Sequence, residues 1–170
     1  ESPWYDLRQD TVKIHTGATI TYTYQDHHGA VVVVPITPTG HVVLLRQYRY
    51  VVGEWCWEVP AGGRDPGEAS LECAARELAE EAGYTAARIE PLGQMLTSKA
   101  VSNERLELFL ATGVTPAPDA LRHEATELMS VHLLPLAEAV ALVHGNAIHD
   151  GATALALLLA AARLAQARGG

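Results

Sequence analysis

The chain has 170 residues, of which 48% are hydrophobic and 19% charged, a composition typical of a globular protein and not of a disordered one. Its formal net charge is −8, which disfavours polyanionic partners such as nucleic acids and anionic membranes. At this length we expect a single domain over residues 1–170, whose hydrophobic core needs neither disulfides nor a structural metal.

The first part of the chain predicts strands joined by tight turns. Residues 11–25 alternate, are rich in Thr, Ile, Val and Tyr, and turn at Gly17, which predicts an antiparallel hairpin. Residues 31–36 and 41–48 are apolar or β-branched runs separated by Pro-Thr-Gly, which predicts a second hairpin. A short strand over residues 55–59 follows and ends at a proline.

The second part predicts helices alternating with strands. Residues 68–82 carry apolar side chains at helical spacing and are followed by Gly83, a typical helix end. We expect further strands over 89–96, 106–111 and 128–134, and helices over 135–144 and 150–168. The last helix has a Leu/Ala face that we assign to the core: Leu155, Leu158, Leu159, Ala162 and Ala165. The pattern predicts an α+β fold whose helices cover a mixed sheet.

Three features of the chain predict a cytoplasmic location. The N-terminal residues are polar and lack the apolar core of a signal peptide. The most apolar stretch, residues 152–162, is too short to cross a bilayer. Cys56 and Cys73 have neither a zinc-binding nor a disulfide spacing, so we expect buried free thiols in a reducing compartment.

One segment concentrates the negative charge. Residues 58–81 contain seven acids and two arginines, a net charge of −5. Glu77 and Glu81 share a helix face, and Glu80 lies three positions from Glu77. Clustered carboxylates suit Mg²⁺ or Mn²⁺, which also bind phosphate oxygens, and Arg76 can hold one carboxylate in place. The spacing therefore indicates a divalent-cation site open to a phosphorylated ligand, with a solvated acidic helix face as the alternative.

The same segment resembles a known family motif. Residues 62–84, GGRDPGEASLECAARELAEEAGY, follow the spacing Gly-x5-Glu-x7-Arg-Glu-hydrophobic-x-Glu-Glu-x-Gly-hydrophobic of the Nudix box. The upstream runs RQYR (46–49) and EVPAG (58–62) resemble the ADP-ribose pyrophosphatase branch of that family. The resemblance covers about residues 11–168 and implies the Nudix fold, a mixed-sheet α/β/α sandwich with an N-terminal antiparallel β-hairpin.

The resemblance also implies roles for the residues of the box. Glu77, Glu80, Glu81 and the Ala61 carbonyl match metal-binding positions, for Mg²⁺ or alternatively Mn²⁺, and Arg76 joins Glu77 and Glu81 in the catalytic set. The remaining box positions are structural: Gly62, Glu68 and Gly83.

Residues outside the box match positions that contact the substrate. These are Arg49, Glu58, Ser98 and Glu104. The activity implied is metal-dependent hydrolysis of a nucleoside-diphosphate-linked substrate, ADP-ribose to AMP and ribose 5-phosphate. The branch has Ser-Pro-Gly where this chain has Ser-Lys-Ala at 98–100, so another nucleoside diphosphate sugar, a dinucleoside polyphosphate or a coenzyme stays open as substrate. A non-catalytic ligand sensor is a further alternative.

Residues 122–127 match a mobile acidic loop of this branch. The resemblance places an extra metal ligand on Glu127. It places the general base on Ala125, which has no carboxylate, so Glu124 would have to serve instead.

The resemblance further divides the chain into two parts. Residues 29–170 form the expected catalytic core, and residues 1–28 form strands that we expect to hold a homodimer together. Tyr22 and Tyr24 share a strand face there, where they pack within the sheet or stack on a nucleobase.

Overall fold

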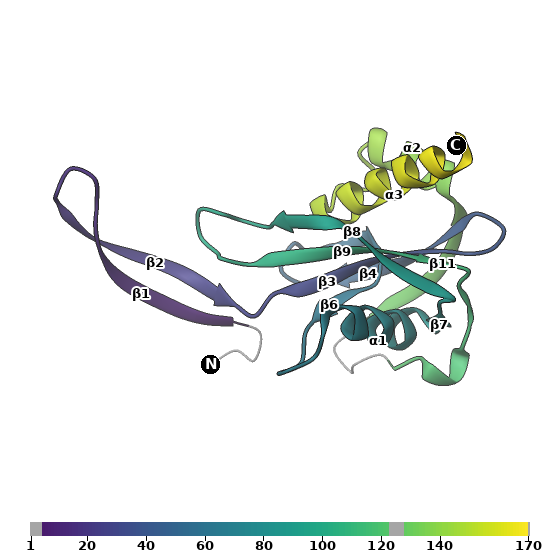
Figure 1. Ribbon diagram of the computed structural model, residues 1–170, viewed down its shortest axis with the longest axis horizontal. Helices are drawn as coiled ribbons and strands as arrows, with labels where there is room; N and C mark the ends of the chain where they lie inside the picture. The colour runs from purple at the N-terminus through teal and green to yellow at the C-terminus, as the bar shows by residue number, and fades with distance from the viewer. Residues whose placement is uncertain (1–4, 123–127, 170) are drawn as a thin grey trace.

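A computed structural model describes residues 5–122 and 128–169 (Figure 1). Its strands are β1 (Tyr5–Lys13), β2 (Thr19–His27), β3 (Ala30–Ile36), β4 (His41–Arg49), β5 (Glu54–Glu58), β6 (Ala61–Gly63), β7 (Tyr84–Thr85), β8 (Arg88–Leu96), β9 (Arg105–Thr112), β10 (Thr115–Pro116) and β11 (Met129–Pro135). Its helices are α1 (Ser70–Ala82), the short 3₁₀ helix η1 (Pro118–Ala120), α2 (Leu136–His144) and α3 (Gly151–Gly169). Every long element that the sequence predicts is present, with ends shifted by a few residues.

A mixed sheet organises the fold. Its strands lie in the order β11-β4-β3-β9-β8, with β5 beside β4 and β6 beside β3. β3 and β9 are parallel, whereas β4 runs antiparallel to both β5 and β11. The four valines of β3, residues 31–34, are all buried, because both faces of this central strand are covered.

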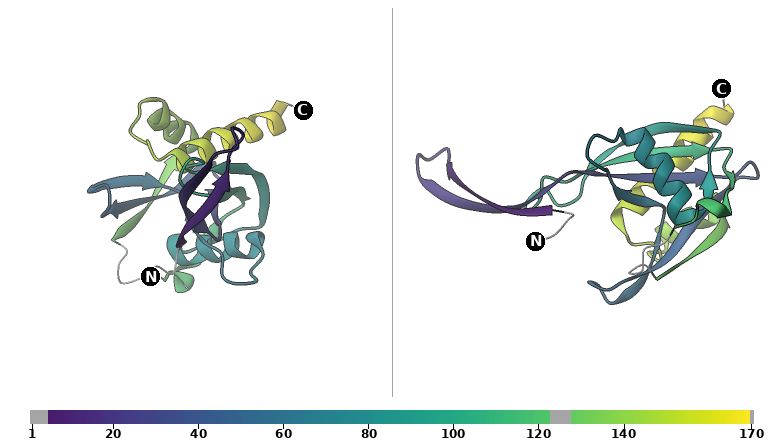
Figure 2. Two further views of the ribbon diagram at one scale, coloured as in Figure 1. Left: turned by 90° about the vertical axis from the view of Figure 1, so that its left-hand side faces the viewer. Right: turned by 90° about the horizontal axis from the view of Figure 1, so that it is seen from below.

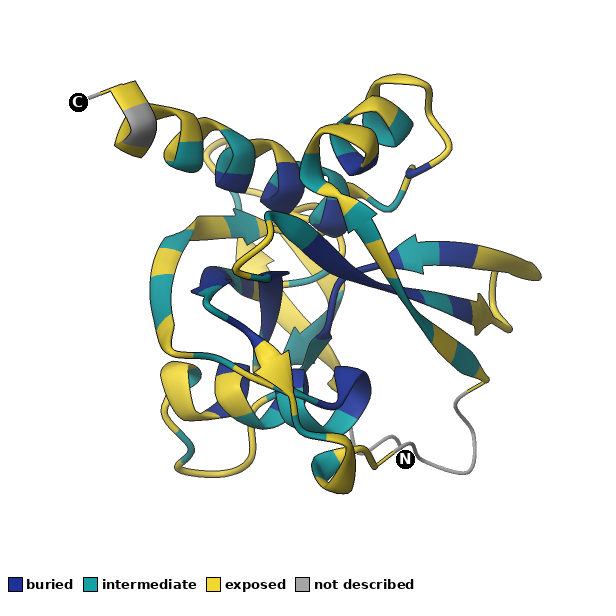
Figure 3. Ribbon diagram, turned by 90° about the vertical axis from the view of Figure 1, so that its right-hand side faces the viewer, coloured by how far each residue is buried: buried dark blue, intermediate teal, exposed yellow. Residues whose placement is uncertain are grey.

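Helices cover the two faces of the sheet in separate layers. The helix α1 lies on one face, and α2 and α3 lie on the other (Figures 1 and 3). Two apolar clusters result, one that includes Leu78 of α1 with Val31 and Val33, and one that includes Leu157 of α3 with Val32 and Val34. The expected α/β/α sandwich is therefore confirmed, and the alternating side chains of β3 explain how one strand serves both clusters.

The N-terminal hairpin is present and longer than expected. β1 and β2 pair from Tyr5↔His27 to Lys13↔Thr19, and Gly17 in the turn has a φ of 87°. The hairpin extends away from the sheet (Figures 1 and 2), and every residue of β1 is exposed. Its contacts with the rest of the chain include backbone hydrogen bonds between Gln25 of β2 and Val101 and Asn103.

The second expected hairpin, between β3 and β4, is formed only at its turn. These strands share the single pair Ile36↔Val42 and then diverge. Beyond the turn, β3 pairs with β6 and β9, and β4 pairs with β5 and β11. The divergence separates the two strands, and β6 with the loop that follows it lies beside β3 instead of β4.

The buried face of α3 differs from the prediction. Its fully buried residues are Thr153, Ala156, Leu157 and Ala160, whereas Leu158 is 37% exposed. Leu155 and Leu159 are partly buried against the core, and Ala162 and Ala165 are exposed. An Ala/Leu-rich helix is apolar around most of its surface, so its own pattern does not fix which stripe faces the sheet.

Two further expectations concern the cysteines and a membrane-spanning helix. Cys56 and Cys73 are free and buried, as predicted. In the described part of the chain, no helix combines the length and the apolar character that crossing a membrane requires.

Candidate active site

The helix α1 presents its carboxylates beside the core that anchors it. Cys73, Ala74, Leu78 and Ala82 pack into the apolar cluster under the sheet. Glu77 and Glu81 lie at the edge of that buried stripe and expose only 8% and 7% of their surface. Burial raises the pKa of Glu77, which Arg76 opposes. Buried carboxylates that the fold keeps despite their desolvation cost indicate a functional site.

Arg76 is the centre of a hydrogen-bond network that joins the helix to the preceding loop. Its Nε donates to Glu68 Oε1 at 2.8 Å, and one terminal nitrogen donates to Glu77 Oε1 at 2.7 Å and Glu80 Oε2 at 3.2 Å. The other terminal nitrogen donates to Glu68 Oε2 at 2.9 Å and to the Gly63 carbonyl at 3.0 Å. One guanidinium therefore sets the positions of three carboxylates.

Glu68 lies before α1 and braces the loop. The helix begins at Ser70, two residues later than predicted, because the backbone of Ala69 is extended, with a φ of −73° and a ψ of 144°. The Glu68 carboxylate accepts from the Asp65 backbone N–H at 3.0 Å. The bidentate pair with Arg76 lowers the pKa of Glu68 from 4.5 to about 2. The Glu68 carboxylate thus joins the loop to Arg76 of α1.

Gly62 and Gly83 are both positions that require glycine, for different reasons. A Cβ on Gly62 would lie 2.1 Å from Glu77 Oε1, so only glycine lets the buried carboxylate approach the backbone. Gly83 has a φ of 70° and its N–H donates to the Ala79 carbonyl at 3.0 Å, which ends the helix.

Glu81 joins the helix to β6. Its Oε2 accepts from the Ala61 backbone N–H at 2.8 Å, and Ala61 pairs with Val32 of the central strand. The position of this carboxylate is therefore fixed relative to the sheet.

Arg49 and Glu58 form a bidentate ion pair. Arg49 is at the end of β4 and Glu58 at the end of β5, and both guanidinium-to-carboxylate bonds are present. The bond to Glu58 raises the pKa of Arg49, and the charge of Glu81 raises it further. The two residues predicted to contact the substrate thus hold each other beside the carboxylate cluster.

A cavity of about 600 Å³ lies between the loop, the helix and the end of β4. Its lining includes Arg49, Ala61, Gly62, Arg76, Glu77, Glu80 and Glu81 from the predicted set, together with Gln47, Tyr48, Tyr50, Val51, Gly63, Asp65 and Arg122. Sequence reasoning gave no role to Gln47 or Arg122. The signal for Gln47 is its spacing: two positions before Arg49 on a strand, it points to the same face.

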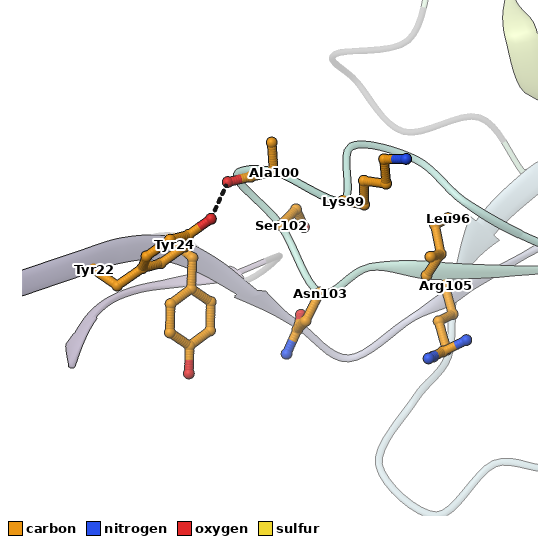
Figure 4. Close-up of a pocket in the computed structure, with 8 residues that line it drawn as sticks. All are labelled: Tyr22, Tyr24, Leu96, Lys99, Ala100, Ser102, Asn103 and Arg105. Carbon is orange, nitrogen blue, oxygen red and sulfur yellow. Dashed lines mark hydrogen bonds between the residues drawn. The ribbon is translucent and has the colours of Figure 1, made fainter. Parts of the chain in front are cut away.

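The structure does not bring Ser98 and Glu104 to this cavity. They belong to the loop between β8 and β9, which lies against β2: the Gln25 N–H donates to the Val101 carbonyl at 2.8 Å, and Glu104 lies 3.2 Å from His27. A second hollow of about 470 Å³ lies at this junction. Figure 4 shows Tyr22 donating to the Ala100 carbonyl there, at 3.0 Å.

The donor set of the cavity fits a hard divalent cation in its chemistry. The groups are carboxylates, which Mg²⁺ and Mn²⁺ prefer over nitrogen or sulfur ligands. Within residues 5–122 and 128–169, no three His, Cys, Asp or Glu side chains form a ready metal-binding group. Arg76 contacts Glu77 and Glu80, and Glu81 accepts from a backbone N–H. Glu124 and Glu127 lie outside the described residues.

Comparison with known proteins agrees with this geometry. The NUDIX domain family matches residues 26–155. The chain is 36% identical over 138 residues to an ADP-ribose pyrophosphatase of Mycobacterium tuberculosis (79% of this chain, 66% of that protein) and 30% identical over 152 residues to one of Bacillus subtilis (89% and 82%).

A solved structure supports the fold. "Crystal structure of ADP compounds hydrolase" matches with a TM-score of 0.83 at 23% sequence identity, and the match covers 98% of this chain and 89% of that one. With the family match over most of the chain and the box carboxylates gathered at one cavity, the chain belongs to the Nudix hydrolase family.

Proposed function

We propose that this chain hydrolyses the diphosphate of a nucleoside-diphosphate-linked substrate, with ADP-ribose, cleaved to AMP and ribose 5-phosphate, as the foremost candidate. The main support is the carboxylate cluster that Arg76 organises in a cavity also lined by Arg49. The curated relatives named as ADP-ribose pyrophosphatases favour this substrate.

The proposed activity uses a divalent cation, Mg²⁺ or Mn²⁺. We assign its ligands to Glu77, Glu80, Glu81, the Ala61 carbonyl and Glu127. When bound, such a cation neutralises diphosphate charge and makes water a better nucleophile.

The chain's own residues position and balance the charges. Arg76 keeps Glu77 and Glu80 in place by donating to both, and it opposes the burial that raises the pKa of Glu77. Arg49, fixed by Glu58, offers a cation to the phosphates at the cavity wall. We assign proton abstraction from the attacking water to Glu124.

The other proposed substrate contacts are Ser98 and Glu104. Both lie in the loop that β2 holds, so the N-terminal hairpin sets where these residues lie. We also propose that residues 1–170 form a single cytoplasmic domain, with residues 1–28 joining two copies into a homodimer.

A substrate panel tests the activity. The purified chain is incubated with ADP-ribose, a GDP-sugar, a dinucleoside polyphosphate and a nucleoside triphosphate, each with Mg²⁺, with Mn²⁺ and with excess EDTA. We expect the highest kcat/KM for ADP-ribose, equal amounts of AMP and ribose 5-phosphate, and no product with EDTA. Faster cleavage of another diphosphate would reassign the substrate, and binding without cleavage of any of them would favour a ligand sensor.

A further inference from the structure

Arg122 is a residue of the active-site cavity whose positive charge has no carboxylate partner among the described residues. The cavity lining includes two other arginines, Arg49 and Arg76. The guanidinium of Arg49 is paired with the Glu58 carboxylate, and that of Arg76 with carboxylates of the loop and of α1. Arg122 therefore differs from both in having its charge available to a ligand.

Backbone hydrogen bonds hold Arg122 beside the helix that carries the carboxylates. The Arg122 N–H donates to the Glu80 carbonyl of α1 at 2.7 Å, and the Ala117 N–H donates to the Gly83 carbonyl at 2.7 Å. The 3₁₀ helix η1 lies between these two bonds. The backbone of Arg122 is thus fixed to the residue whose side chain, that of Glu80, lines the same cavity.

The guanidinium of Arg122 is held at one nitrogen and open at the other two. Its Nη1 donates to the Asp119 carbonyl at 2.6 Å and to the Leu121 carbonyl at 2.8 Å. A guanidinium has five N–H donors, so three remain on Nε and Nη2, and none of these has a partner in the described part of the chain. Nε and Nη2 are also the pair of nitrogens with which Arg49 holds Glu58. Arg122 is exposed, so a ligand can reach this edge.

The open edge of Arg122 fits an oxyanion. Two N–H donors in a planar fork bind carboxylate or phosphate oxygens in a bidentate manner. The Glu77 and Glu80 carboxylates of the cavity already accept from Arg76. An anion that enters with the substrate is therefore the better partner for Arg122, and the anion of a nucleoside-diphosphate compound is its diphosphate.

We propose that Arg122 is a substrate-binding residue whose Nε and Nη2 donate to non-bridging oxygens of the substrate's diphosphate. The inference rests on the proposed function and adds to that site a cation from outside the Nudix box. The diphosphate carries its charge before it is cleaved, so the contact forms when the substrate binds. Loss of the contact should therefore raise KM more than it lowers kcat.

Two variants of the full chain separate the charge of Arg122 from its role in the turn. Arg122→Gln keeps an N–H donor for the turn carbonyls and removes the charge, whereas Arg122→Lys keeps the charge. Arg88→Gln makes the same change at an exposed arginine of β8. Calorimetric titration with inorganic pyrophosphate in the presence of Mg²⁺ measures binding, and hydrolysis of ADP-ribose at saturating Mg²⁺ gives KM and kcat.

We expect Arg122→Gln to bind pyrophosphate about 10–100-fold more weakly than the wild type, the effect of hydrogen bonds to a charged group. Its KM for ADP-ribose should rise by a similar factor, with kcat and melting temperature close to the wild type. Arg122→Lys should recover part of the affinity, because it restores the charge without the planar fork. Arg88→Gln should match the wild type in every measurement.

Three results would overturn the inference: unchanged pyrophosphate affinity in Arg122→Gln, a lowered kcat with unchanged KM, or binding by Arg122→Lys no better than by Arg122→Gln. If Arg122→Gln does not fold, the Nε–H resonance of Arg122 in the wild type, identified by its absence in Arg122→Lys, decides the question. That resonance should shift when pyrophosphate is added, and a constant position would refute the contact. A wild type that cleaves no diphosphate would reject the proposed function, whereas the pyrophosphate titration would still decide whether Arg122 binds one.

Discussion

Glu81 is a buried carboxylate for which we propose a role in the chemistry. It is nearly buried, bonds the Ala61 N–H, and lies on the same helix as Glu77 and Glu80. Like charges at this spacing destabilise a helix. The cluster is therefore better explained by a ligand than by stability.

Glu81→Gln is expected to lower kcat at saturating Mg²⁺ by more than about 100-fold, since removing even an outer-shell partner of a metal costs 10–100-fold. The far-ultraviolet circular dichroism and melting temperature should stay close to the wild type, because Gln keeps an acceptor for Ala61. The matched control is Glu72→Gln, on the exposed part of the same helix. Near-wild-type hydrolysis by Glu81→Gln would refute its assignment as a metal ligand.

Glu68 has the opposite balance, because its charge supports the fold. Its pKa is about 2 in the folded protein, below the ordinary 4.5. The folded state therefore favours the ionised form, and the resulting stability is present above pH 4.5 and is lost as the pH falls toward 2.

Glu68→Gln is expected to reduce the free energy of unfolding at pH 7 by about 1–3 kcal/mol, the contribution of hydrogen bonds to charged groups. The difference from the wild type should shrink between pH 4.5 and pH 2, because the carboxylate takes up its proton below pH 4.5 in the unfolded state but only near pH 2 in the folded state. Urea unfolding at pH 7, 4.5 and 3 measures this difference in the free energy of unfolding, and Glu138→Gln, at an exposed position, is the control. A difference that does not change with pH would show that the Arg76 pair is not its source.

At the scale of the elements, the loop and α1 act as one unit. Arg76 and Glu68 join them, and Gly62 provides the space in which the Glu77 carboxylate lies. The loop between β8 and β9 is joined to the hairpin by backbone hydrogen bonds to Gln25.

Gly62→Ala tests the loop–helix unit. The added Cβ would fall 2.1 Å from Glu77 Oε1, so the carboxylate must leave its place beside Arg76. We expect hydrolysis to fall at least about 10-fold while the sheet and core persist, because the clashing atoms end a side chain and no backbone must move. Gly151→Ala, where a Cβ meets nothing within 4 Å, is the control. A crystal structure of Gly62→Ala with Glu77 unmoved would contradict this explanation.

At the scale of the whole molecule, the hairpin β1–β2 is the part that the core does not stabilise. It leaves the body of the protein (Figure 2), and exposed apolar residues such as Leu7 (73%) and Tyr22 (45%) lie along it. Unpaired strand edges of this kind are commonly covered by a second copy.

A homodimer is therefore expected, with a mass of twice 18.2 kDa by light scattering at micromolar concentration. Leu7→Asp in the hairpin should shift the mass toward the monomer, because a charge buried in an interface is costly. Leu133→Asp, at an exposed site on β11, should leave it unchanged. A monomeric wild type would reject the homodimer. Dissociation by Leu133→Asp alone would place the interface away from the hairpin.

The sequence by itself determined the family, the order of the long elements and the Nudix box. These features depend on local spacing: the same-face glutamates of α1, the glycine that ends it, and the alternation of the strands. The element boundaries depend on more than spacing: α1 begins at Ser70 because the backbone of Ala69 is extended.

Only the tertiary structure decided what depends on contacts between distant segments. The turn between β3 and β4 predicted a hairpin, but beyond the turn β3 pairs with β6 and β4 pairs with β5 at the edges that a hairpin would have joined. The sheet likewise selected the Thr153–Ala160 stripe of α3 over the predicted one, since an all-round apolar helix has no preferred face of its own. The buried Oε1 of Gln47, which has no hydrogen-bond partner among the described residues, is likewise a result of the tertiary structure, because burial depends on how the chain packs and not on the spacing of its residues.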